Sequence, residues 1–358
     1  MSLDKNFLEY PRRKYGMDHD RYEWSMLTDR KNVIWPEGKK LALWVNVCIQ
    51  FFPINQNGKP FVPTGGMTMP YPDLRHYSLR EYGNRVGIYR FLKAFDQYSI
   101  KPTFALNTRV AERYPYLIDL LKERGNEILC HGLHMDALHY GGQDINEERE
   151  QVDLSLNKLR ELTGQDIIGW ISPDRSESEN TPELLVEHGV QYFCDWVNDD
   201  MPYQFKTANG DIVAMPLSQE LEDSFILLNN KHTEDSYVEQ ICDACDFLIE
   251  EADKQGGRIL SLSIHPWMLG QPHRIGKLES VLEYVTSKSE VFIIDDGDVP
   301  SIKGSVSSNL QCSTSKRNFN GCNVGSRKCC CLAKELKFFL SIITKVTHIL
   351  TTRPTGNV

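Results

Sequence analysis

Histidine, carboxylate and arginine side chains recur directly after apolar segments that have the length of a β-strand. His131 follows one such segment, Arg175 lies just beyond a second, Asp195 follows a third and His265 follows a fourth. Imidazoles and carboxylates transfer protons near neutral pH, and a guanidinium binds carbonyl oxygens or carboxylates. A single histidine in such a place is most often structural, but recurrence after four segments favours one shared site for acid–base chemistry.

Strand-like and helix-like segments alternate between residues 39 and 300. The first strand is a continuous apolar run at 41–48, long helices are predicted at 145–162 and 234–255, and a last strand is predicted at 291–294. Parallel strands joined by helices bring their carboxyl ends to one rim. Seven or eight such units over about 260 residues favour a closed, irregular (β/α)7-type barrel, with an open doubly wound sheet as the alternative.

The two ends of the chain differ from this middle part. Residues 1–38 are polar and aromatic without a clean period, which predicts an irregular N-terminal arm. Residues 301–358 carry nine Lys and Arg against one acid and hold five of the ten cysteines. We therefore expect an arm (1–38), a barrel (39–300) and a basic, cysteine-rich tail (301–358) that lies outside the barrel and is disordered or loosely packed.

The composition excludes several classes of protein. The net charge is −9 over 358 residues, and the basic tail leaves −17 on residues 1–300. A nucleic-acid partner is therefore not expected, because phosphate binding needs a concentrated positive field. No apolar run is long enough to cross a membrane, and the N-terminus has no apolar signal segment, so we expect a cytoplasmic protein. Apolar residues in the arm favour a homo-oligomer.

Short motifs in a fixed order resemble those of the polysaccharide deacetylase superfamily, which carries the NodB homology domain. The likeness is greatest to its cytosolic, allantoinase-like branch and extends over about residues 10–290. The motifs are Tyr10-Pro11-Arg12, Trp35-Pro36, His131-Gly132, Ser172 to Ser176, Asp195-Trp196 with Asn198-Asp199-Asp200, and Ile264-His265-Pro266. The resemblance implies an irregular, usually seven-stranded (β/α) barrel that hydrolyses a non-peptide carbon–nitrogen bond, most often an N-acetyl group on an amino sugar.

The resemblance and the chemistry of the side chains together suggest roles. His265 corresponds to the family's late-strand histidine and is the candidate general acid, while His131 is the candidate base if no metal ion is bound. Arg175 would bind a substrate carbonyl or carboxylate, or hold an aspartate ionised. The predicted catalytic residues are His265, His131, Arg175, Asp195 and Asp199, and the predicted substrate-binding residues are Asp174, Trp267, His273 and Arg274.

The family's metal site is only partly matched. Its metal-dependent members place an Asp-Asp pair after the first strand and use an H-x-x-x-H motif. Here the first strand runs into Cys48 to Gln50 without a carboxylate, and Met135 stands four residues beyond His131, where the second histidine belongs. His131 and His134 could still ligate one zinc ion. The alternative is a site without a metal.

These observations predict a hydrolase of non-peptide carbon–nitrogen bonds. The expected substrate is a small amide, an allantoin-like ureide or an N-acetylated sugar. Because the first-strand carboxylates are missing, the alternative function is a catalytically inactive barrel that binds small molecules.

Overall fold

The computed structural model describes residues 18–56 and 74–294. Within these residues nine strands form one sheet. The strands are β1 (Leu41–Ile49), β2 (Thr103–Leu106), β3 (Ile128–Cys130), β4 (Gly169–Trp170), β5 (Tyr192–Phe193), β6 (Tyr203–Thr207), β7 (Gly210–Ala214), β8 (Arg258–Ile264) and β9 (Val291–Ile293). Every pairing is parallel except that of β6 with β7. The tail predicted at 301–358 lies outside the described residues.

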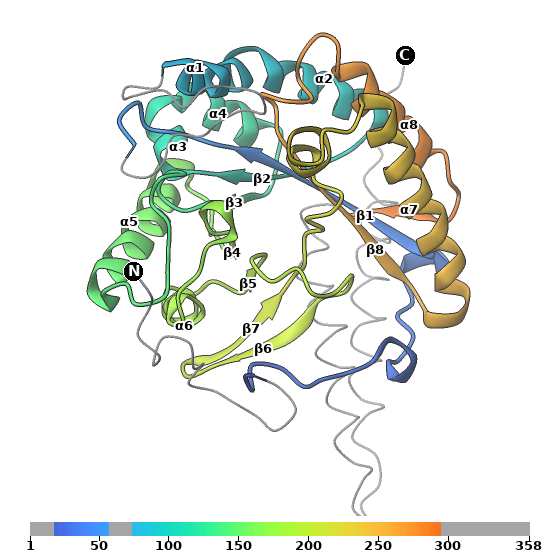
Figure 1. Ribbon diagram of the computed structural model, residues 1–358, viewed down its shortest axis with the longest axis horizontal. Coiled ribbons are helices and arrows are strands. Elements are labelled where there is room, and N and C mark those ends of the chain that lie inside the picture. Colours follow the sequence, from blue (N-terminus) through green and yellow to red (C-terminus); the bar gives the residue numbers. More distant parts are fainter. Residues whose placement is uncertain (1–17, 57–73, 295–358) are drawn as a thin grey trace, which may run out of the picture. The chain divides into compact units, whose positions relative to one another are not determined.

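Helices follow most of the strands and lie on the outer side of the curled sheet (Figure 1). The α-helices are α1 (Leu74–Tyr82), α2 (Ile88–Tyr98), α3 (Thr108–Arg113), α4 (Pro115–Glu123), α5 (Ile145–Thr163), α6 (Thr181–Glu187), α7 (Glu234–Gln255) and α8 (Ile275–Thr286). Shorter turns are η2 (Leu27–Asp29), η3 (Pro36–Gly38), η4 (Gly83–Gly87), η5 (Pro173–Arg175) and η6 (Phe225–Asn229). None of the helices in this described part is long and apolar enough to cross a membrane.

The order of the strands decides between a barrel and an open sheet. The sheet runs β6-β7-β5-β4-β3-β2-β1-β8, so strands that follow each other in the chain are mostly neighbours. The first strand pairs with β8 along Leu41 to Val47, which brings the two ends of the series together. A doubly wound sheet would reverse direction at a switch point. The irregular barrel predicted from the sequence is therefore confirmed, in the form of a curled sheet.

The curled sheet separates two apolar layers. Leu43, Val45 and Val47 of β1 belong to the large layer that also contains Phe91 of α2 and Val281 of α8. The intervening side chains of β1 turn to the inside of the curled sheet. There Trp44 and Cys48 meet residues of β2, β3 and β5 in a second, smaller cluster. The continuous apolar run at 41–48 is explained by this, since both of its faces are buried.

The curled sheet is open along a seam between β8 and the β6-β7 hairpin, which stand at the two ends of the strand order. β7 and β8 share no ladder among the described residues, and the chain that follows β7 crosses the seam as a loop. The backbone N–H of Ser218 donates to Ser261 Oγ of β8 at 3.0 Å, so the loop is tied to the free edge. This loop, residues 215–224, carries side chains that complete the candidate site described below.

Two local sequence patterns fold differently from what they predict. The run Thr181-Pro182-Glu183 predicts a helix capped by Thr181, but α6 begins at Thr181 and its cap is Asn180. The Thr181 hydroxyl instead donates to the buried Glu148 at 2.5 Å, which joins α6 to α5. Helical spacing of apolar residues predicts one helix at 84–98, whereas the structure has α1, the π-turn η4 and α2 in succession.

Candidate active site

His265 follows β8 and is held by a carboxylate from the seam loop. Asp223 Oδ1 lies 2.6 Å from His265 Nδ1, and Asp223 Oδ2 accepts the backbone N–H of His265 at 2.8 Å. Both side chains are buried. Burial alone would lower the pKa of His265, but the Asp223 carboxylate outweighs it and holds that pKa well above its usual range. The Asp223 carboxylate therefore favours the protonated form of the His265 imidazole, whose Nε2 lies on the side of the ring opposite to Nδ1.

His131 follows β3 and has the opposite environment. Its Nδ1 lies 2.9 Å from the carbonyl oxygen of Ile171, which requires Nδ1 to carry the proton and donate it. Its Nε2 is buried and has no hydrogen-bond partner in the part of the chain that the structure describes. Burial, together with the positive charges of His265 and Arg175, lowers the pKa of His131 to about 4 against the opposing effect of the Ile171 carbonyl. His131 is therefore neutral at neutral pH.

The backbone next to His131 needs a glycine. Gly132 has a φ of +66°, and a Cβ there would lie 2.7 Å from the Pro173 ring. Asn107, which follows β2, donates from its side-chain amide to the His131 carbonyl and accepts the Phe51 N–H at 2.8 Å. These contacts join the ends of β1, β2 and β3, so the orientation of His131 is fixed by its backbone.

Arg175 lies beside both histidines on a strained turn. Its Nη2 is 2.9 Å from Glu222 Oε2, and Glu222 in turn feels the charge of His265. Burial opposes ionisation of Glu222, but Arg175 and His265 lower the pKa of its carboxyl. Asp174 and Arg175 have φ values of 56° and 50°. Two successive non-glycine residues in the left-handed region cost about 1–3 kcal/mol each, which is typical of functional turns.

Asp195 follows β5 and supports the turn that carries Arg175. It accepts the Ser172 N–H at 2.7 Å and the Ser172 hydroxyl at 2.8 Å. Burial raises the pKa of Asp195 to about 6 in spite of these bonds. A second buried carboxyl, Glu177, forms a hydrogen bond with Asp195, and burial and then the charge of Asp195 hold its pKa well above the usual range. Burial thus favours the neutral form of both carboxyls, and the Ser172 contacts of Asp195 hold the start of the Arg175 turn in place.

The structure brings four of the predicted residues together. His131 feels the charges of His265 and Arg175, and Arg175 acts on Asp195. Asp174 also belongs here, because burial and then the charge of Glu222 raise the pKa of its carboxyl. Trp267 lies at the edge, with its ring 5.8 Å from that of His265 and its buried Nε1–H without a partner among the described residues.

Three other predicted residues are placed elsewhere. Asp199 forms an ion pair with Arg30 at 2.6 Å. Arg274 pairs with Glu234 of α7 at 2.9 Å, and the His273 side chain is 61% exposed. These residues do not directly follow a strand. Asp199 lies four residues beyond Asp195, and His273 and Arg274 lie eight and nine residues beyond His265.

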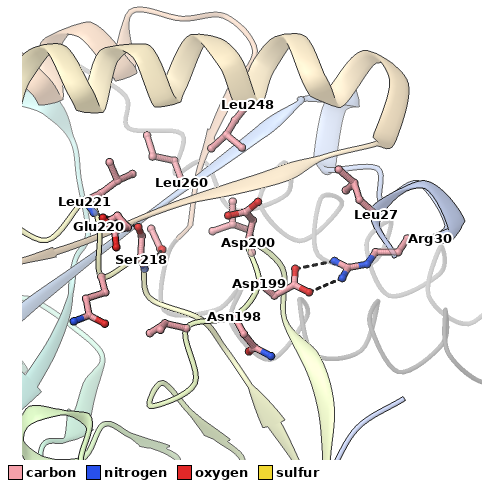
Figure 2. A pocket seen from close by; sticks show the side chains of 14 residues that line it. Leu27, Arg30, Asn198, Asp199, Asp200, Ser218, Glu220, Leu221, Leu248 and Leu260 are labelled. Carbon is pink, nitrogen blue, oxygen red and sulfur yellow. Dashed lines mark hydrogen bonds and ion pairs between the residues drawn. The ribbon is translucent and has the colours of Figure 1, made fainter. Parts of the chain in front are cut away.

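Asp199 lines a cavity of about 530 Å³ along the seam (Figure 2). Leu248 of α7 and Ile259 to Ser261 of β8 form one side of it, and Ser218 to Leu221 of the seam loop form another. Those β8 residues lie four to six positions before His265, which is roughly 13–20 Å along a strand. The cavity is therefore separate from the histidine cluster, although the same loop reaches both.

The residues around His131 do not fit a divalent metal ion. Among the described residues, no three His, Cys, Asp or Glu side chains are arranged to hold one. His134 Nδ1 accepts a hydrogen bond from the Asp136 N–H at 3.2 Å. The open Nε2 of His131 faces the positive charges of Arg175 and His265, which repel a cation.

Several site residues were missed in the sequence. Glu222 and Asp223 come eight and nine residues after the end of β7, so a search directly after strands could not find them. Gln50, placed with its amide nitrogen 3.2 Å from His265 Nε2, follows β1 but is not acidic. Glutamate side chains are usually exposed, and the sequence gives no sign that the tertiary fold buries Glu177.

The arrangement agrees with the comparisons with known proteins. Residues 81–193 match the family model for polysaccharide deacetylase. This part of the chain is therefore similar to polysaccharide deacetylases. The matched residues hold His131, Arg175 and part of the sheet, whereas Asp223 and His265 lie beyond them.

Individual relatives show the same similarity to polysaccharide deacetylases. A provisionally named polysaccharide deacetylase of Schizosaccharomyces pombe is 23% identical over 286 residues, or 72% of this chain and 88% of its own length. The peptidoglycan deacetylase of Helicobacter pylori is 22% identical over 243 residues, covering 59% of this chain and 81% of the relative. The crystal structure of Puue allantoinase matches with a TM-score of 0.68 and 26% identity, over 76% of this chain and 92% of that one. The chain is thus deacetylase-like in sequence and in fold.

Proposed function

We propose that this chain is a polysaccharide deacetylase-like enzyme that hydrolyses non-peptide carbon–nitrogen bonds, with His265 as the acid and His131 as the base. The observation that carries the proposal is the pair of buried histidines whose surroundings push their pKa values in opposite directions. Such a split is what acid–base assignments require, because one group must be protonated and the other free at the same pH.

His265 has the properties of an acid for the departing nitrogen. Asp223 holds its Nδ1–H and keeps the ring protonated, so Nε2 can give up a proton and Asp223 stabilises the charge before transfer. A protonated Nε2 donates, so the Gln50 amide beside it must present its oxygen. We infer that Gln50 holds this proton until a substrate nitrogen takes its place.

His131 has the properties of a base for water. The Ile171 carbonyl fixes the proton on Nδ1, which leaves a lone pair on the unpartnered Nε2. Its low pKa makes it a weak base comparable to a carboxylate, which suits a water molecule held close to a polarised carbonyl. Arg175, anchored by Glu222, can bind that carbonyl oxygen as negative charge develops on it.

The substrate class follows from the size and charge of the groups in the cluster. We propose a small amide, with an allantoin-like ureide favoured and an N-acetylated sugar as the second candidate. The likeness to an allantoinase structure supports the ureide, and the deacetylase relatives support the acetyl sugar. Trp267 offers an unpartnered N–H near His265 for such a polar substrate. An inert binding barrel is less well supported, because it would not need His265 and His131 in opposite protonation states.

We propose further that catalysis uses no resident divalent ion. The mismatch of the donors around His131 supports this, and His134 then has no ligating role. The proposed enzyme is cytoplasmic, and its exposed arm residues Trp24 (69% exposed) and Ile34 (82% exposed) support self-association. Light scattering on the full chain, compared with a Trp24→Ser, Ile34→Ser variant, tests the association.

One experiment tests the function directly. The purified full chain is assayed for ammonia or acetate release from allantoin, N-acetylglucosamine and simple amides, with and without a chelator. Turnover that survives chelation is expected, together with its loss in His265→Gln. His188→Gln is the matched control, since His188 Nδ1 also contacts a backbone carbonyl, Leu184, but outside the cluster. Full activity of His265→Gln would contradict the proposal, and loss of activity with the chelator would contradict the metal-free site.

A further inference from the structure

Cys48 occupies a position inside the curled sheet next to the proposed acid. Val47 pairs with Ile264 in the parallel ladder, so the next residues on the two strands, Cys48 and His265, lie side by side. The Cys48 side chain belongs to the inner cluster and is among the groups that raise the pKa of His265. Asp223 Oδ1 lies 2.6 Å from Nδ1 of that imidazole. Thiol, imidazole and carboxylate thus lie next to one another.

Other donors also converge on the same sulfur. The side-chain amide of Asn46 donates to Cys48 Sγ at 3.2 Å, and the Ser263 hydroxyl lies 3.5 Å from it. Hydrogen bonds that a sulfur accepts stabilise its thiolate, which is the nucleophilic form of cysteine.

We propose that Cys48 is the nucleophile of this site and forms a thioester with the acyl part of the substrate. The inference rests on the proposed function, since it uses the same acid and base. Activation of a thiol by a neighbouring imidazole, oriented in turn by a carboxylate, is a general solution for acyl transfer. The first-strand position that lacks a carboxylate is thereby given a chemical role of its own.

The two half-reactions balance in atoms and protons. In the first, the Cys48 thiolate attacks the amide carbonyl, the carbon–sulfur bond forms, and the carbon–nitrogen bond breaks as His265 Nε2 gives its proton to the leaving nitrogen. In the second, water attacks the thioester while His131 Nε2 accepts its proton. The carbon–sulfur bond then breaks, the acid leaves, and the proton passes from His131 to His265 as the thiolate is restored.

The test uses p-nitrophenyl acetate, an activated ester that acylates a nucleophile whatever the natural amide is. We expect a burst of about one equivalent of p-nitrophenolate from the full chain and, after acid quenching, one acetyl group on the Cys48 peptide by mass spectrometry. Cys48→Ala should lose the burst and the adduct, whereas the control Cys245→Ser, which removes a buried thiol of α7, should keep both. Amide turnover by Cys48→Ala should fall by about 10³-fold or more.

The outcomes separate this inference from the proposed function. Amide hydrolysis within about tenfold of the full chain by Cys48→Ala, or by Cys48→Ser if the alanine variant does not fold, would overturn the nucleophile and leave the hydrolase intact. An adduct that maps to any other residue would also overturn it. Acetylation of Cys48 without hydrolysis of any amide in the panel would support the nucleophile and contradict the proposed function.

Discussion

The turns after β3 and β8 each bury one histidine at the same rim of the sheet, yet the two rings differ in charge. His131 Nδ1 faces a backbone carbonyl, while His265 Nδ1 faces the Asp223 carboxylate. Burial disfavours the imidazolium in both places, and only the carboxylate supplies enough opposite charge to overcome it. The partner of Nδ1 therefore decides in which direction the pKa of each histidine is shifted, and the proposed roles of acid and base follow from that difference.

Replacing the carboxylate should have the largest effect on this difference. In Asp223→Asn the pKa of His265 should fall, because burial remains and the negative charge is gone. We expect turnover to fall by about 10²–10⁴-fold. The alkaline limb of the kcat/KM profile should move to lower pH, since the acid must stay protonated. The control is Asp153→Asn, which removes the carboxylate beside His188. An unchanged alkaline limb in Asp223→Asn would contradict the conclusion that Asp223 raises the pKa of His265.

Removing the base should cost somewhat less. His131→Gln keeps a donor for the Ile171 carbonyl but has no imidazole lone pair, so we expect turnover to fall by about 10²–10³-fold. The acid limb of kcat/KM, which should lie near the pKa of about 4, should disappear from the residual activity. His188→Gln should behave like the unmodified chain in the same titration. An acid limb that persists in His131→Gln would assign it to another group.

The two histidines should also differ in how they link stability to pH. His131 has a pKa of about 4 when folded and about 6.5 when unfolded, so the unfolded chain binds its proton first as the pH falls. The free energy of unfolding should therefore decrease between pH 6.5 and 4, by at most roughly 3 kcal/mol. The raised pKa of His265 acts oppositely: its contribution is present below pH 6.5 and is lost as the pH rises through the folded value.

Urea unfolding across this pH range measures the linkage. The decrease between pH 6.5 and 4 should be smaller in His131→Gln than in His188→Gln. Equal slopes in the two variants would show that His131 is not buried in its neutral form.

The smallest effect is expected from Glu222, which anchors Arg175. Glu222→Gln keeps the shape of the contact and removes its negative charge, so Arg175 should be held less firmly and KM should rise by about tenfold with a smaller change in kcat. Glu234→Gln, which breaks the Arg274 pair on α7, is the matched control. A larger loss in kcat than in KM would place Glu222 in the proton-transfer steps.

The barrel type of the fold and the gathering of four candidate side chains could be predicted from the sequence, because strands of a parallel barrel end at one rim. His131, Arg175, Asp195 and His265 were found in this way, each within a few residues of a strand. Asp199, His273 and Arg274 are farther from the ends of their strands, and they lie outside the cluster. A side chain several residues past a strand end is placed by its loop, and the sequence carries no periodic signal for that.

The sequence by itself determined the alternating elements, the buried first strand and the residue types available for acid–base chemistry. Tertiary structure alone decided the protonation states, because Asp223 is 42 residues away from His265 in the chain and Ile171 is 40 residues away from His131. The spacing of apolar residues predicts burial over a few neighbouring positions of the sequence. A pKa depends instead on the charges that the fold brings within a few ångströms of the group. For the same reason, the neighbourhood of Cys48 became visible only when β1 and β8 were paired.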